Sequence, residues 1–370
     1  ADQVFSITND LSAFYDVERV KLDEQINSLR DFRLDSATGK TYIQNKYQAI
    51  IIAKPDSVFS QKDKFIIDQY VMRGGNILWL VDPVFAEMDS VSTKGETIGI
   101  VNELNLSDMF FRYGVRMNTN LLQDLNALPI PIITGKMANQ PQMEMIPWFF
   151  FPIITPLTDH PKTKNLNSLR TEFISSIDTV GDPAIKKSVL LTTSRYTKLI
   201  NVPAIISLNV LKHKPDKREF GLNSLPVAVL CEGGFTSLFK DRLESDMDTN
   251  KLIAFVDKSQ KPSKMVFVAD GDIIKNQFSK QGPLPLGYDK YTQMSFGNKD
   301  FIMNVMNYLC GDESLMQVRS RNQIIRKLDE TKINRDKFYW QMFNIATPLV
   351  MIILMGISFA YIRKRKYSKK

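Results

Sequence analysis

The chain has 370 residues, with 48 lysines and arginines, 40 acidic residues and a formal net charge of +8. Residues 316–337 and 363–370 hold 13 of these cations and three of the anions, which leaves residues 1–315 with a net charge of −2. This distribution argues against a nucleic-acid-binding protein, because residues 1–315 have no excess of lysine and arginine with which to contact phosphate groups. Two cysteines and two histidines are too few for a disulfide framework or a zinc centre, so we expect no metal and no cofactor.

The first third of the chain alternates between helical and strand patterns. Short apolar runs indicate buried strands, and apolar residues at helical spacing indicate the helices between them. Gly74-Gly75 lies where a left-handed helix end is expected. The predicted elements are helices over residues 3–15, 61–72 and 103–113, and strands over residues 15–22, 47–53 and 77–81 and near Val115.

This order predicts an α/β fold with a doubly wound, mostly parallel sheet of the flavodoxin or amidotransferase-like kind. Further short strands are predicted at 189–192, 204–208, 227–231 and 264–269, followed by a helix over 300–309. We expect the later strands to rejoin the first sheet, so that residues 84–260 are a long insertion in an α/β domain of residues 1–315. Such a domain normally begins with a central strand, and this pattern begins with a helix. We therefore expect the first strand to lie upstream of Ala1.

Residues 126–161 are rich in proline and large apolar residues, including Trp148-Phe149-Phe150-Phe151. Residues 146–155 carry no charge, but Pro147, Pro152 and Pro156 exclude a membrane-spanning helix there. Two alternatives remain, extended structure packed on the domain or an apolar surface for a partner, and packing is favoured.

Polar residues follow several predicted strands, at the ends where open α/β sheets bind ligands. These are Lys54-Pro55, Asp82-Pro83, Cys231-Glu232 and Asp270-Gly271-Asp272. Asp82, Asp270 and Asp272 are the candidate ligand-binding residues, with the alternative that each caps a turn or the next helix. No nucleotide-binding, hydrolase or metalloprotease motif is present, so we expect no catalytic residue, and any energy must come from another chain.

The end of the chain has the composition of a membrane span. Residues 341–362 contain no charged residue, and 22 residues of helix measure about 33 Å, enough to cross a bilayer core. The alternative of a buried core helix does not account for four consecutive cations at its end. The expected interface and anchor residues are Tyr339, Trp340, Pro348, Gly356, Tyr361, Arg363, Lys364, Arg365 and Lys366.

The flanks of this span suggest a topology. Residues 316–340 are predicted to form a charged juxtamembrane stalk helix, and residues 363–370 a basic tail that contacts anionic lipid. The dense cations of the tail favour a cytoplasmic C-terminus at the inner membrane, with residues 1–315 outside the cytoplasm. A chain whose span lies at its end would normally leave its domain inside. We therefore expect an upstream signal or span, and a chain that begins within a longer protein.

Three segments resemble a known family. Residues 65–83 (FIIDQYVMRGGNILWLVDP), 296–321 (FGNKDFIMNVMNYLCGDESLMQVRSR) and 335–367 (RDKFYWQMFNIATPLVMIILMGISFAYIRKRKY) are similar to the gliding-motility-associated ABC transporter auxiliary subunits of Bacteroidota, the GldG family. The resemblance implies an extracytoplasmic α/β domain on the inner membrane. It also implies a multispanning permease and a cytoplasmic ATPase as partners, in a complex needed for gliding and linked to type IX secretion. The family usually has a further N-terminal span and domain, and we expect this sequence to begin after both.

The leading hypothesis is a non-catalytic accessory subunit whose span docks on the permease and whose stalk transmits permease motion. The second hypothesis is an anchored module that binds a glycan, peptide or small molecule at the strand ends. A third is a degenerate amidotransferase-like hydrolase that uses Cys231, although a small buried hydrophobic role for this cysteine is favoured.

Overall fold

The computed structural model describes residues 2–34, 41–137, 140–156, 166–212, 215–221, 224–242, 254–311 and 330–367. Residues 1–321 form one compact unit and residues 322–370 form a second. The first unit contains the sheets and their cores, and the second contains the long helix α8 (Glu330–Tyr367).

A five-stranded mixed sheet lies at the centre of the first unit, in the order β13-β16-β17-β4-β3. The strands β3, β4 and β17 pair in parallel, whereas β16 is antiparallel to both β17 and β13. The α/β class is confirmed, but the doubly wound, mostly parallel arrangement is not, because parallel pairing is limited to three strands. The strands are β3 (Ala49–Ala53), β4 (Asn76–Leu80), β13 (Lys186–Thr192), β16 (Pro226–Gly233) and β17 (Ser263–Val268).

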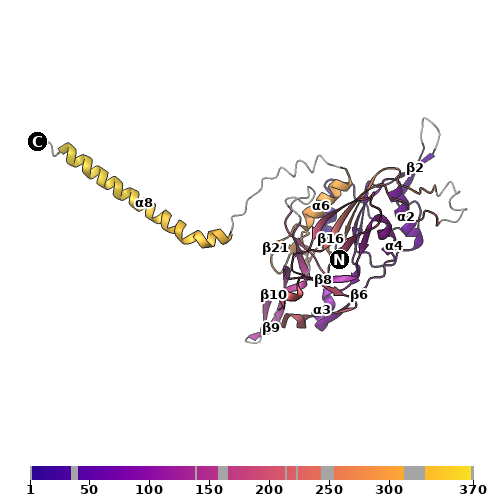
Figure 1. Cartoon of the computed structure of the whole chain (residues 1–370), viewed down its shortest axis with the longest axis horizontal. Helices are drawn as coiled ribbons and strands as arrows, with labels where there is room; N and C mark the ends of the chain where they lie inside the picture. Colours follow the sequence, from indigo (N-terminus) through magenta and orange to yellow (C-terminus); the bar gives the residue numbers. More distant parts are fainter. Residues whose placement is uncertain are drawn as a thin grey trace. The chain divides into compact units, whose positions relative to one another are not determined.

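Helices cover both faces of this sheet (Figure 1). The helices α2 (Gln61–Met72) and α4 (Ser107–Tyr113) share one core with Trp79 and Phe267. On the other face, α1 (Phe5–Ser12) and α6 (Asn298–Leu309) pack with Leu78 and Val266. Successive side chains of a strand point to opposite faces, so continuous apolar runs such as Asn76–Leu80 supply both cores.

Local signals fix the ends of α2. The Ser60 side chain accepts a hydrogen bond from the Asp63 backbone N–H at 3.1 Å, which caps the start of the helix. Gly74, with φ +86°, turns the chain at the other end. Gly75 must also be glycine, because an added Cβ would lie 2.3 Å from the Tyr70 ring. The sequence prediction of this helix is therefore confirmed at both ends.

The aromatic segment around Trp148 packs inside the protein. The strands β9 (Ala127–Met137) and β10 (Gln140–Ile154) pair as a long antiparallel ribbon. All four residues of Trp148-Phe149-Phe150-Phe151 are buried, and most of them belong to a third apolar cluster with Phe173 and Ile206. The packed alternative is thus confirmed for this run.

The predicted strand over residues 15–22 is wrong. Residues 16–22 have no regular structure, and Val17 and Val20 are exposed. An alternating pattern alone does not make a strand, because its backbone groups need a neighbouring strand as partner.

Smaller elements complete the first unit. Two three-stranded sheets have the orders β15-β6-β5 and β11-β10-β9, and two-stranded pairs join β1 with β2, β7 with β12, β8 with β14, β18 with β19 and β20 with β21. Their bounds are β1 (Arg30–Leu34), β2 (Thr41–Asn45), β5 (Val84–Phe85), α3 (Met88–Lys94), β6 (Glu96–Val101), β7 (Val115–Met117), β8 (Asn120–Asp124), β11 (Leu169–Arg170), β12 (Ile177–Thr179), β14 (Thr197–Asn201), β15 (Ala204–Ser207), η1 (Leu208–Lys212), η2 (Lys217–Glu219), η3 (Asp272–Ile274), β18 (Phe278–Ser279), β19 (Gly282–Pro283), β20 (Tyr288–Asp289) and β21 (Met294–Ser295).

The buried carboxylate of Asp68 on α2 provides a test of this packing. It accepts hydrogen bonds from the Tyr113 hydroxyl at 2.9 Å, the Ser237 hydroxyl at 2.6 Å and the Leu238 N–H at 2.8 Å. Asp68→Ala leaves these donors buried without their acceptor, so we expect a loss of about 3 kcal/mol or more in unfolding free energy. Urea unfolding of the detergent-solubilised chain, followed by tryptophan fluorescence, measures it.

The matched control is Asp178→Ala, which removes an exposed carboxylate paired with Arg116. An exposed ion pair contributes about 0–1 kcal/mol. Equal losses in the two variants would contradict the structural role of Asp68.

Candidate functional site

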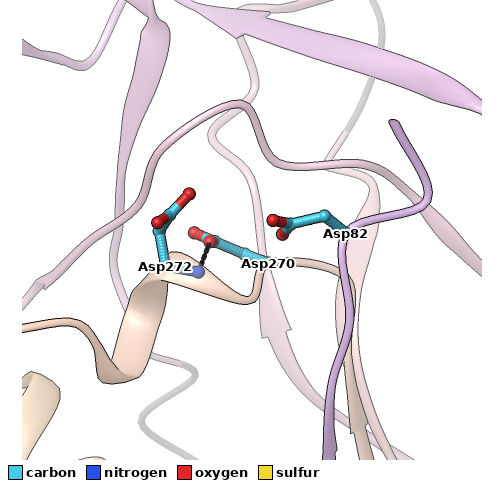
Figure 2. Close-up of side chains that lie close together, drawn as sticks. All are labelled: Asp82, Asp270 and Asp272. Atoms are coloured by element: carbon cyan, nitrogen blue, oxygen red, sulfur yellow. Dashed lines mark hydrogen bonds between the residues drawn. The ribbon is translucent and has the colours of Figure 1, made fainter. Parts of the chain in front are cut away.

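Four charged side chains meet at one edge of the central sheet. Lys54 follows β3, Asp82 follows β4, and Asp270 and Asp272 follow β17. These three strands are parallel, so their carboxyl ends lie at the same edge. Figure 2 shows the carboxylate of Asp82 directed toward Asp270, and that of Asp270 toward Asp272. One carboxylate oxygen from each aspartate lies within 4.8 Å of the others.

Two of the carboxylates hold neighbouring loops together. Asp82 Oδ1 accepts a short hydrogen bond from the Gly271 N–H. Asp270 Oδ1 accepts from the Asp272 N–H at 2.7 Å, and Asp270 Oδ2 from the Glu172 N–H at 3.0 Å. The bond to Asp272 N–H is a local turn bond at the start of η3. The turn-capping alternative therefore describes part of what Asp270 does.

Lys54 is the residue of this cluster to which the sequence analysis assigned no role. Its Nζ lies 2.5 Å from Asp272 Oδ2 and 3.2 Å from Asp82 Oδ2, so one ammonium bridges two carboxylates. The sequence signal for this role was the position of Lys54 directly after a predicted strand. In the structure the Lys54 backbone has a left-handed φ of +45°. Gly271 allows this approach, because an added Cβ would lie 2.8 Å from the Lys54 Cβ.

The excess of carboxylates shifts the pKa values of the cluster. Burial, followed by repulsion from Asp272, raises the pKa of Asp82 to about 6, against the attraction of Lys54. Burial and the same repulsion raise the pKa of Asp270 well above its ordinary value. Burial by itself lowers the pKa of Lys54, but the attraction of Asp82 and Asp272 together outweighs it and raises that pKa.

The cluster combines one ammonium group with three carboxylates. Lys54 supplies between Asp82 and Asp272 the positive charge that a metal ion would supply in a carboxylate site. Asp272 Oδ1 accepts no hydrogen bond from the described residues, and its ion-pair partner is Lys275 Nζ at 3.3 Å. Lys54 remains about one-third exposed, so the cluster is reachable from solvent through its ammonium.

Cys231 and Glu232 do not join this edge. Cys231 pairs with Met265 near the start of β17, because β16 is antiparallel, so these two residues lie at the opposite edge of the sheet. Burial raises the pKa of the Cys231 thiol to about 12, which keeps it protonated at neutral pH. The expectation that all four strand ends share one edge is wrong for this strand.

The second unit contains the predicted membrane helix. Residues Gln341–Lys366 form one helical stretch of 26 residues. Its most apolar window of 18 residues has a mean hydropathy of 2.2, and none of that window is buried. This rules against the alternative of a buried core helix. Within the span, Pro348 has no N–H to donate, and the neighbouring Thr347 hydroxyl donates to the Phe343 carbonyl at 2.7 Å.

The other predicted anchor residues all lie on α8. Tyr361 is exposed, and so are the cations that follow it, which lie at the helix end where positive charge is favoured. Gly356 lies inside the span, and Tyr339 and Trp340 are part of the helix, with side chains outside the described set. Of the predicted stalk, residues 330–340 continue directly into the span, whereas residues 316–329 lie outside the described residues.

The pKa of Asp82 predicts a pH-dependent stability. An aspartate has a pKa of about 3.9 in an unfolded chain, so the folded state binds this proton more tightly. The resulting stabilisation is complete below about pH 4 and is lost as the pH rises through about 6. Relative to Asp82→Asn, the wild-type chain should therefore gain about 1–3 kcal/mol between pH 7 and pH 4, measured by urea unfolding. Parallel pH profiles of the two chains would contradict the raised pKa.

Comparison with known proteins places most of the first unit in one family. Residues 2–305 match the family ABC_transp_aux, described as an ABC-type uncharacterized transport system. The chain is also similar to the mmIFT52 N-terminal domain, at 12% identity and a TM-score of 0.41, over 83% of this chain and 90% of that one. A likeness of this size carries no functional argument, and no curated protein sequence matches the chain. The match over residues 2–305 shows that the chain belongs to the ABC-type transport-system auxiliary family.

Proposed function

We propose that this protein is a non-catalytic, membrane-anchored accessory subunit of an ABC transporter, whose helix over residues 341–362 docks on a multispanning permease. One observation carries the proposal: a domain of the transport-system auxiliary family is followed, in the same chain, by an apolar helix long enough to span a membrane. Family membership implies association with transporter components. A cytoplasmic ATPase supplies the energy in this proposal, because the chain has no nucleotide-binding motif.

The proposed orientation places residues 1–315 outside the cytoplasm and residues 363–370 inside, at the inner membrane. The four consecutive cations from Arg363 to Lys366 support it, because such clusters favour the cytoplasmic side and bind anionic lipid there. Each cation near such a surface contributes about 1 kcal/mol to binding.

Helix α8 provides a physical basis for coupling. Its 38 residues correspond to about 57 Å of helix, roughly 25 Å more than the bilayer core. Because α8 is continuous from residue 330 to residue 367, a tilt of the span moves residues 330–340 with it, and Pro348 is the point at which this helix can bend. We propose that this extension passes permease motion to the domain. Residues 316–329 of the predicted stalk lie outside the described residues, so the proposal rests on residues 330–340.

The finer proposal is a role in gliding motility, linked to type IX secretion. Its support is the resemblance of residues 65–83, 296–321 and 335–367 to the GldG family of Bacteroidota. The family match is compatible with this resemblance at the coarser level of a transport-system auxiliary protein.

Crosslinking and purification from native membranes test the proposal. The wild-type chain should recover a permease and an ATPase. Replacing residues 330–340 with a Gly-Ser segment of the same length should keep membrane insertion and copurification but abolish the cellular function, because the rigid link is lost. A matched replacement of the same residues by an Ala-rich helix should retain function. Recovery of neither transporter component from the wild-type chain would contradict the proposal.

A second candidate function is binding of a glycan, peptide or other small molecule at the Asp82–Asp270–Asp272 cluster. The observation that favours it is a buried group of carboxylates with raised pKa values, at the edge where open α/β sheets hold ligands. Buried charge of this kind is costly for stability, and ligand binding is a function that accounts for its presence.

A melting screen tests this second function. The full chain in detergent is heated with a panel of saccharides and tripeptides, and a true ligand should raise its melting temperature. Asp82→Lys and Asp270→Asn should abolish that rise, whereas Asp178→Lys, far along the chain and exposed, should retain it. A rise that persists in both site variants would place the ligand elsewhere.

A further inference from the structure

The outward face of one small sheet is both apolar and exposed. In the sheet β15-β6-β5, Ile205 pairs with Ile98, and Phe85 pairs with Ile100. Directly paired residues of antiparallel strands point to the same face, as do residues two apart on one strand. The four side chains therefore form one patch, called here the outer sheet face. Their exposed fractions are 70% for Ile205, 59% for Ile98, 49% for Ile100 and 48% for Phe85.

The other face of this sheet already packs on the protein. Val84 and Ile206 point inward and are 2% and 0% exposed. A Cβ added at Gly99 would contact Leu121 of β8 at 3.1 Å. A sheet with one buried face normally carries polar side chains on the other. Four large apolar residues instead expose an area on the order of a few hundred Å², the size that marks an interaction site.

Acidic residues flank β5 and β6 along the chain. Glu96 begins β6, Glu103 follows its end by two residues, and Glu87 and Asp89 follow β5. All four are exposed, and none forms an ion pair with another described residue. Residues 84–105 contain only one cation, Lys94. The patch is therefore apolar at its centre, and the segments that flank β5 and β6 are acidic, whereas η1, which follows β15, ends in one cation, Lys212.

We propose that the outer sheet face binds a partner protein whose contact surface has apolar side chains flanked by lysine or arginine. Charge complementarity selects this partner over two others. A lipid surface with anionic headgroups would be repelled by the acidic residues. A second copy in a symmetric dimer would place the same acidic residues against each other. The inference goes beyond the proposed function and does not require the partner to be the permease.

Site-specific photocrosslinking of the full chain in native membranes tests the proposal. A photoreactive residue replaces Ile98 or Ile205, and the control replaces Tyr291, which is 51% exposed but lies between β20 and β21. Both patch positions should crosslink to the same protein, and the Tyr291 position should not. Mass spectrometry of the crosslinked peptide should show apolar residues next to lysine or arginine.

Charge reversal distinguishes specific docking from nonspecific hydrophobic association. The combined variant Glu96→Lys and Glu103→Lys should lower the crosslink yield at least about fivefold, which corresponds to about 1 kcal/mol. Adding Asp178→Lys to the photoreactive chain instead should leave the yield unchanged. All these positions are exposed, so the melting temperature should stay at the wild-type value and confirm that each variant is folded.

Several outcomes would overturn the inference: a crosslink to a second copy of the chain, a crosslink to lipid, an acidic partner peptide, a yield insensitive to charge reversal, or no crosslink at either position. The test is separable from that of the proposed function. A basic apolar partner unrelated to a transporter supports the surface and weighs against the accessory role. Copurification of permease and ATPase without a crosslink from the outer sheet face would support the accessory role and contradict the proposed docking surface.

Discussion

The parallel pairing of β3, β4 and β17 is the constraint on which the rest of the domain depends. Ile77, Leu78, Trp79 and Leu80 are all fully buried, so β4 supplies apolar side chains to the cores on both faces at once. Such a strand is stable only when helices cover both faces, which is why α2 and α4 lie on one side and α1 and α6 on the other. The same pairing forces the three carboxyl ends to one edge, and with them Lys54 and three aspartates.

At that edge the fold buries three carboxylates close together, which costs stability. One lysine bridges two of three neighbouring carboxylates, and burial, together with repulsion between the carboxylates, raises the pKa values of Asp82 and Asp270. The hydrogen bonds from Gly271, Asp272 and Glu172 offset part of the cost of burying these groups. The cluster ties four loops together while leaving Lys54 in contact with solvent.

The chain exposes apolar surface in two different ways. Helix α8 is apolar around its whole circumference over the span, as expected of a helix whose surroundings are lipid or other spanning helices. The outer sheet face is apolar on one side only, and acidic residues flank two of its three strands, as expected of contact with a protein of opposite charge. An accessory subunit anchored beside a transporter needs surfaces of both kinds, one in the membrane and one outside it.

The sequence by itself determined the elements whose causes are local. The ends of α2 follow from Ser60 and Gly74, and the span follows from length, apolarity and the cations after it. Only the tertiary structure decided which strands pair and in which direction. It placed Cys231 on the far edge because β16 is antiparallel, left residues 16–22 without a partner strand, and brought Lys54 to Asp272 across 218 residues of chain. Strand pairing depends on contacts between residues far apart in the sequence. A local pattern of apolar and polar residues therefore does not specify which strand will pair with it, or in which direction.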